Sequence, residues 1–113
     1  MRRQLIGAAL LVIAAAGGCA APPSGHQYTV TITADPIDGA DFSPSVLDIH
    51  AGDTVTWINE DPTKLHTVTA RDDSFGSAFL SQGQRYTVRF NQPGVYRYFC
   101  DIHPTMVGQV DVT

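Results

Sequence analysis

The 113-residue sequence is poor in basic residues, cysteine and histidine, and each shortage excludes a class of function. Seven Lys and Arg residues stand against eleven Asp and Glu. The basic residues form no cluster, so nucleic acid and anionic membrane surfaces are not expected partners. The four histidines are too few for an enzyme that needs several metal ions bound by histidine clusters. The sequence contains no internal repeat. The protein is expected to be a monomer.

The longest apolar run covers residues 5–16, which is too short for a membrane-spanning helix. It follows Arg2 and Arg3 and leads through small residues to Cys19, which predicts a signal peptide over residues 1–18. The ending Ala16-Gly-Gly-Cys19 resembles a lipoprotein box, although that box usually has Leu where Ala16 stands. Lipidation of Cys19 is therefore predicted, and cleavage after Ala20 is the alternative. Sec and twin-arginine export both remain open.

An exported protein is expected in the periplasm or at the cell surface. Removal of the signal peptide would leave a tether and one domain. Residues 19–27 contain Pro, Ser and Gly without periodicity, which predicts a flexible tether. Residues 28–113 form the predicted domain, long enough for one modest core. Without residues 1–18, five basic and all eleven acidic residues remain, so this part is strongly acidic.

Apolar and polar residues alternate with a period of two through most of the predicted domain, and no helical period is present. Such a pattern, broken by turn residues, predicts an all-β fold, an antiparallel β-sandwich of about seven strands. Trp57 is expected to anchor its core. The expected strands are residues 28–33, 42–50, 54–58, 65–70, 85–90, 95–100 and 106–112.

The junction between the last two strands gathers metal-binding side chains. Cys100 ends one strand, His103 lies in a short loop, and Met106 opens the next strand with Cys100 and Met106 on the core-facing side. Thiolate and thioether ligands suit copper, and thioether sulfur is a poor ligand for zinc or hard cations. His66, at the head of another strand, would complete a His2Cys site with a weak axial Met.

Each of these residues alone has an ordinary structural explanation, but the four together favour a metal site. If Cys19 is lipidated, Cys100 is a lone thiol in an oxidising compartment, where burial or metal binding would protect it. By contrast, His26 and His50 are expected to lie at the surface. Glu60 and Asp61 precede a proline and are interpreted as a solvated turn.

The pattern Phe42-x-Pro-x2-Leu-x-Ile-x2-Gly-Asp-Thr-Val-Thr-Trp57, followed by Asn59, His66 and Gly94-Val-Tyr-x-Tyr-x-Cys100-x2-His103-Pro-x-Met106, resembles the small cupredoxins, with amicyanin, plastocyanin and pseudoazurin most similar. The resemblance implies a Greek-key sandwich that holds one Cu(I)/Cu(II) ion at a type 1 site. It assigns the ligands to His66, Cys100, His103 and Met106.

Two positions depart from the family pattern. Thr67 stands where relatives commonly have an Asn that ties the two ligand loops together, and a hydroxyl can do part of this work. Ile102 stands where related loops can carry Pro, so it retains an N–H group. This N–H is expected to bond the Cys100 sulfur and raise the redox potential.

The expected function is that of a blue-copper electron carrier between extracytoplasmic redox partners, and not that of an enzyme. A transient partner is expected to dock around His103, where Ile102, Pro104 and Thr105 form a small weakly polar patch. The alternatives are a copper storage or delivery protein, an enzyme of the multicopper type, and a metal-free interaction sandwich. The last of these leaves the Cys-x2-His-x2-Met spacing unexplained.

Overall fold

The computed structural model describes residues 25–37 and 39–113. The predicted signal peptide, Cys19 and most of the predicted tether lie outside these residues. Within the described part, eight strands are present, and no segment forms a helix long and apolar enough to cross a membrane.

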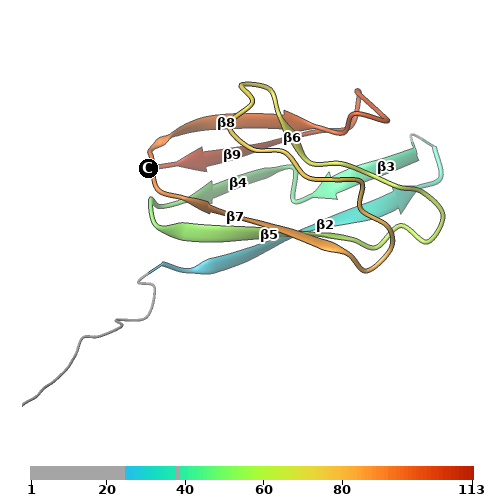
Figure 1. Ribbon diagram of the computed structural model, residues 1–113, viewed down its shortest axis with the longest axis horizontal. Helices are drawn as coiled ribbons and strands as arrows, with labels where there is room; N and C mark the ends of the chain where they lie inside the picture. Colours follow the sequence, from blue (N-terminus) through green and yellow to red (C-terminus); the bar gives the residue numbers. More distant parts are fainter. Residues whose placement is uncertain (1–24, 38) are drawn as a thin grey trace, which may run out of the picture.

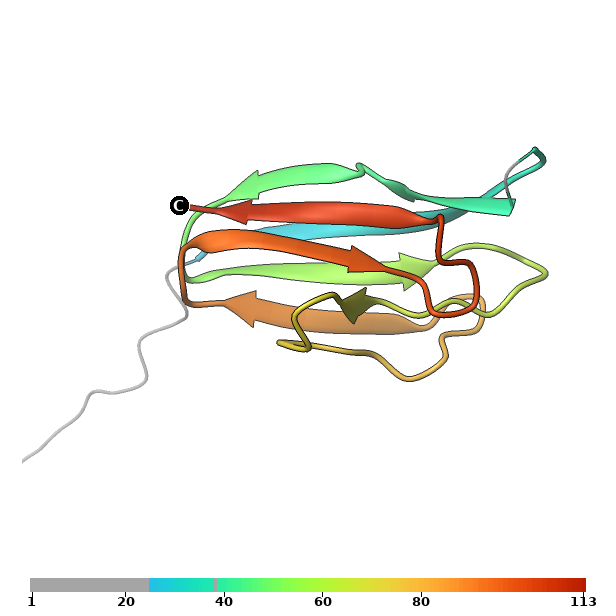
Figure 2. The ribbon, with the colours of Figure 1, turned by 90° about the horizontal axis from the view of Figure 1, so that it is seen from above.

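The strands form two four-stranded sheets that pack face to face (Figures 1 and 2). The first sheet has the order β3 (Gly39–Ser43), β2 (Gln27–Asp35), β5 (Asp53–Asn59), β7 (Arg85–Phe90). The second has the order β4 (Val46–Ile49), β9 (Val107–Val112), β8 (Gly94–Phe99), β6 (Thr69–Ala70). The predicted all-β sandwich is confirmed. Within it, β2 and β5 run parallel, as do β4 and β9.

The core between the sheets is built on aromatic side chains, as the alternation predicts. Trp57 on β5 and Tyr98 on β8 are fully buried and meet edge to face, with ring centroids 5.2 Å apart. Phe42 also packs edge to face on Tyr98, with ring centroids 4.7 Å apart. Such edge-to-face pairs stabilise beyond their buried area, so this cluster fixes β8, the strand that leads into Cys100.

Residues 42–50 do not form one strand. Gly39–Ser43 pairs with β2, whereas Val46–Ile49 pairs with β9 in the opposite sheet. Pro44 lies at the change of sheet, where its missing N–H could not serve a continuous ladder. The alternation predicts strand structure on both sides of Pro44, but it does not predict the crossing between sheets or the pairing of residues 39–41 with β2.

Residues 65–70 also form less strand than predicted. Only Thr69–Ala70 belongs to a ladder, with β8. His66 instead pairs with Leu80 through two backbone hydrogen bonds of 3.1 and 2.8 Å. This isolated bridge holds the His66 backbone in place without a regular strand.

A glycine on β9 makes room for the core. Gly108 lies opposite Tyr98, and a Cβ atom at this position would stand 2.3 Å from the Tyr98 ring. The Tyr98 ring therefore lies directly over the Gly108 backbone, and no larger residue fits without moving a buried side chain.

The two ends of the sandwich differ in what they carry. Residues 60–68 and 100–106 form loops at one end, at the right of Figure 1, and the C-terminus lies at the other. At that other end the Ala51 N–H bonds the Thr113 carbonyl, and the Thr54 N–H bonds the His26 carbonyl. The described chain thus enters and leaves at the end away from the candidate ligands.

Candidate metal centre

The loop after β8 is closed by its own backbone. The Cys100 N–H donates to the Met106 carbonyl at 3.1 Å, and the Met106 N–H donates to the His103 carbonyl at 2.8 Å. These two bonds fold residues 100–106 into a tight turn between β8 and β9. The predicted convergence of Cys100, His103 and Met106 within one turn is therefore present.

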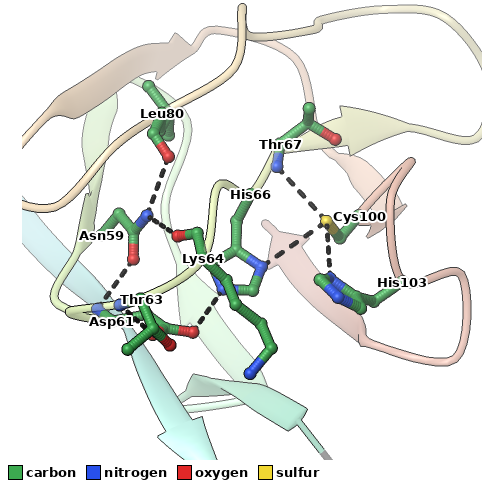
Figure 3. Close-up of polar contacts among 9 residues, drawn as sticks. All are labelled: Asn59, Asp61, Thr63, Lys64, His66, Thr67, Leu80, Cys100 and His103. Atoms are coloured by element: carbon green, nitrogen blue, oxygen red, sulfur yellow. Dashed lines mark hydrogen bonds and ion pairs between the residues drawn. The ribbon is translucent and has the colours of Figure 1, made fainter.

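Two histidine rings and one sulfur atom meet at this loop (Figure 3). The Nδ1 atom of His66 lies 3.8 Å from Cys100 Sγ, and Nδ1 of His103 lies 3.9 Å from the same sulfur. The three donor atoms all lie within 4.8 Å of one another. His66 and Cys100 are fully buried, whereas His103 is half-buried. Segments 34 residues apart in the sequence thus come together around one point.

Met106 completes the loop and points inward. Its side chain is buried, at 4% exposure, and belongs to the core cluster that also contains Cys100. The predicted core-facing parity of both residues is met. His26 and His50 lie outside the cluster at the exposed opposite end, as predicted.

A buried carboxylate orients His66, and sequence reasoning missed it. Asp61 Oδ2 lies 2.8 Å from His66 Nε2, and both side chains are fully buried. Since Nε2–H donates to the carboxylate, Nδ1 keeps its lone pair and faces the Cys100 sulfur. The interpretation of Asp61 as part of a solvated turn is wrong. Spacing gave no signal, because no regular element links positions 61 and 66.

The Asp61 carboxylate stays ionised in spite of its burial. Burial opposes ionisation, but hydrogen bonds from the His66 ring and from the Thr63 N–H and hydroxyl outweigh it and lower the pKa of Asp61 below the ordinary range. A negative charge thus lies behind the imidazole, on the side away from Cys100, and makes Nδ1 a stronger donor.

Asn59 braces the loop that carries Asp61. Its Nδ2 donates to the carbonyls of Lys64 and Leu80 at 3.1 and 2.8 Å, and its Oδ1 accepts the Asp61 N–H at 2.8 Å (Figure 3). The side chain is fully buried at the end of β5. Protein contacts therefore set the position of His66 before any ligand binds.

Thr67 joins the two ligand loops in two ways. Its N–H donates to Cys100 Sγ at 3.3 Å, and its hydroxyl accepts the Asp101 N–H at 2.8 Å. The hydroxyl thus does the joining work that the family pattern gives to Asn. The expectation for Ile102 is not met: within the described residues, the backbone N–H that reaches the sulfur belongs to Thr67.

The chemistry of these donors fits a copper ion. One thiol, two imidazoles and the thioether of the same loop match the His2Cys set with a weak axial Met, which is typical of blue copper and unsuited to hard cations. The side chains of His66, Cys100 and Met106 are buried away from water. Fold and site together define a β-sandwich protein of the type 1 copper class.

Comparisons with known proteins agree with this class. The cupredoxin-like domain family model matches residues 6–112, and the chain belongs to this family. It is 31% identical to amicyanin of Paracoccus versutus over 133 aligned positions, covering 99% of this chain and 95% of the relative. It is 35% identical to the chloroplastic plastocyanin of Tetradesmus obliquus, covering 63% of this chain and 57% of that one.

A solved structure, described as a novel purple cupredoxin from Nitrosopumilus maritimus, superposes with a TM-score of 0.65 at 34% identity. The match covers 74% of this chain and 98% of that one. Since the amicyanin and plastocyanin relatives are electron-transfer proteins, the predictions of a small cupredoxin, of one copper cofactor and of a non-enzymatic role are confirmed.

Proposed function

We propose that this protein carries single electrons between extracytoplasmic redox partners on one copper ion held by His66, Cys100, His103 and Met106. The observation that carries the proposal is the meeting of three donor atoms within 4.8 Å around the buried Cys100 thiol. When bound, copper supplies one-electron chemistry between Cu(II) and Cu(I).

The protein's own contribution is to hold the donors still. His66 is fixed by Asp61 on one side and by the backbone bridge to Leu80 on the other. The sulfur of Cys100 accepts the Thr67 N–H, which withdraws charge from a thiolate. Because these contacts do not depend on the ion, the same geometry serves both oxidation states, and little rearrangement accompanies each electron.

The half-buried His103 edge is the proposed contact for a transient redox partner. Beside it, Ile102 is 43% exposed, and Leu65, next to His66, is 46% exposed. A small weakly polar patch of this kind suits a short-lived encounter that buries little area. Docking there brings a partner close to a ligand histidine.

Export and attachment are proposed with the carrier role. A lipid on Cys19 would hold the chain at a membrane surface, with cleavage after Ala20 giving a soluble form instead. The described chain enters the domain at the end away from the ligand loops (Figure 1). An anchored protein would therefore keep its copper site accessible to partners. Mass spectrometry of the mature N-terminus tests the lipid directly.

The visible spectrum tests the function. Addition of Cu(II) to the purified protein is expected to give intense absorption near the orange-red, lost on reduction and restored on oxidation. Cys100→Ser is expected to abolish the band, and Met106→Leu to keep it with an altered potential. His50→Gln, at the opposite end, is the matched control and leaves the band unchanged.

Other spectra would contradict the proposal. Tight Cu(I) binding without a coloured oxidised form would indicate copper delivery, and the absence of copper binding would leave an interaction domain. If the Cys100→Ser variant kept the colour, Cys100 could not be a copper ligand.

A further inference from the structure

The outward face of the second sheet carries a surface that the copper site does not use, and Figure 2 views the molecule from this side. Across β4, β9 and β8, the register places Val46 beside Gln109 and Gln109 beside Arg97. The Arg71 N–H, just after β6, donates to the Arg97 carbonyl at 2.9 Å. We call this surface the arginine face; its residues are Val46, Arg71, Arg97, Phe99, Val107 and Gln109.

The arginine face is hollowed and partly apolar. A groove of about 350 Å³ is lined by Val46 and Val107 together with the two arginines. Val46 is 55% exposed and Val107 is 50% exposed. A second hollow of about 230 Å³ adjoins it and shares both arginines. Apolar surface around arginine is typical of a protein-binding patch.

Charge gives this surface its selectivity. Within the described residues, neither Arg71 nor Arg97 has an ion-pair partner. The Arg71 guanidinium lies over the Phe99 ring, 4.6 Å from its centroid, and this stacking leaves its N–H groups available to a carboxylate. Acidic side chains border this face. Asp72 lines the second hollow, and Asp111, which pairs in register with Asp48, accepts a hydrogen bond from Gln109. Asp101, two residues after Phe99, accepts a hydrogen bond from the Thr69 hydroxyl. An otherwise acidic chain thus presents two free cations together.

The arginine face also lies next to the site in the covalent chain. Phe99, beneath Arg71, is peptide-bonded to Cys100. We propose that the arginine face is a second docking surface, which binds a redox protein through carboxylates that pair with Arg71 and Arg97. This rests on the proposed electron-carrier function. One electron would pass between the docked partner and the copper ion, and no bond would form or break.

An inert anionic probe tests the surface independently of electron transfer. Hexacyanochromate(III) is paramagnetic and broadens the NMR signals of amides near which it binds. On the copper(I)-loaded protein, broadening is expected at Arg97, Val107 and Gln109. The broadening should weaken severalfold in the double variant Arg71→Gln/Arg97→Gln. Arg85→Gln/Arg89→Gln, on the opposite sheet, removes the same number of charges and should keep the broadening.

Reaction rates test whether binding there leads to transfer. Oxidation by hexacyanoferrate(III) at low salt is expected to slow about threefold to tenfold in the double variant, because two steering charges are lost. Oxidation by a cationic cobalt(III) complex should not slow. Arg85→Gln/Arg89→Gln, which changes the net charge equally, should slow hexacyanoferrate less than twofold.

Broadening confined to residues around His103, or equal slowing in both double variants, would overturn the second surface. Neither outcome would touch the carrier function, because the blue absorption and its loss in Cys100→Ser are measured separately.

Discussion

Two buried aspartates, one at each end of the sandwich, do different work. Asp61 at the ligand end accepts hydrogen bonds from Thr63 and from the His66 ring. Asp53 at the other end accepts the backbone N–H groups of His26 and His50, at 2.7 and 2.8 Å. Each carboxylate lies near a histidine, yet only Asp61 holds the imidazole itself. The His26 ring stays exposed, with Nδ1 3.8 Å from Asp53.

The difference shows that burial alone does not identify a functional carboxylate. Asp53 satisfies two main-chain donors and joins the start of β2 to the turn before β5, which is a task of the fold. Asp61 fixes the tautomer and direction of a side chain aimed at a thiol, which is a task of the site. Substitutions at the two positions should therefore separate stability from metal binding.

Asp53→Ala is expected to have the largest effect on stability. It leaves two backbone N–H groups without a partner, and the midpoint of thermal unfolding should fall on the order of 10 °C. The orange-red band of the copper-loaded protein should not change. Calorimetry and the visible spectrum measure the two effects, and a shifted band would show that the ends are coupled.

Asp61→Asn is expected to weaken the site more than the fold. Copper affinity should fall about 10-fold to 100-fold, because the charge behind His66 is lost. Competition with a chelator of known affinity measures this change. Asp72→Asn is the control, since Asp72 is exposed and bonds only its local turn. Equal copper affinity in the wild type and in Asp61→Asn would show that Asp61 does not orient His66 for binding.

Thr67→Val is expected to have a smaller effect, because it removes the hydroxyl but keeps the N–H that reaches Cys100 Sγ. Loss of the bond from Asp101 should cost about 1 kcal/mol of unfolding free energy. Thr67→Ser should retain the wild-type value. Denaturant unfolding of all three proteins checks the difference, and equal stability of Val and Ser variants would contradict the joining role.

Acid should reduce the contribution of Asp53 to the stability of the fold. Hydrogen bonds from the His50 and His26 backbone lower its folded-state pKa, so the ionised form stabilises the fold above the ordinary Asp value of about 3.9. That contribution is lost as the pH falls through the lower folded-state pKa. In copper-free protein, the difference in unfolding midpoint between wild type and Asp53→Asn should shrink steadily below about pH 4. A difference independent of pH would contradict this assignment.

The sequence by itself determined the parts of this protein that depend on local spacing. Alternation identified the strands because side chains on a strand repeat every two residues. Cys100, His103 and Met106 lie in one turn because a connection this short between two adjacent antiparallel strands must reverse the chain direction. The soft donors among them indicated copper before any geometry was known.

Only the tertiary structure decided what depends on contacts between distant segments. The sheet change between Ser43 and Val46, the carboxylate behind His66 and the Thr67 N–H at the sulfur carry no local pattern. Each arises because closing the sandwich buries polar groups, which must then find partners wherever the packed chain places them.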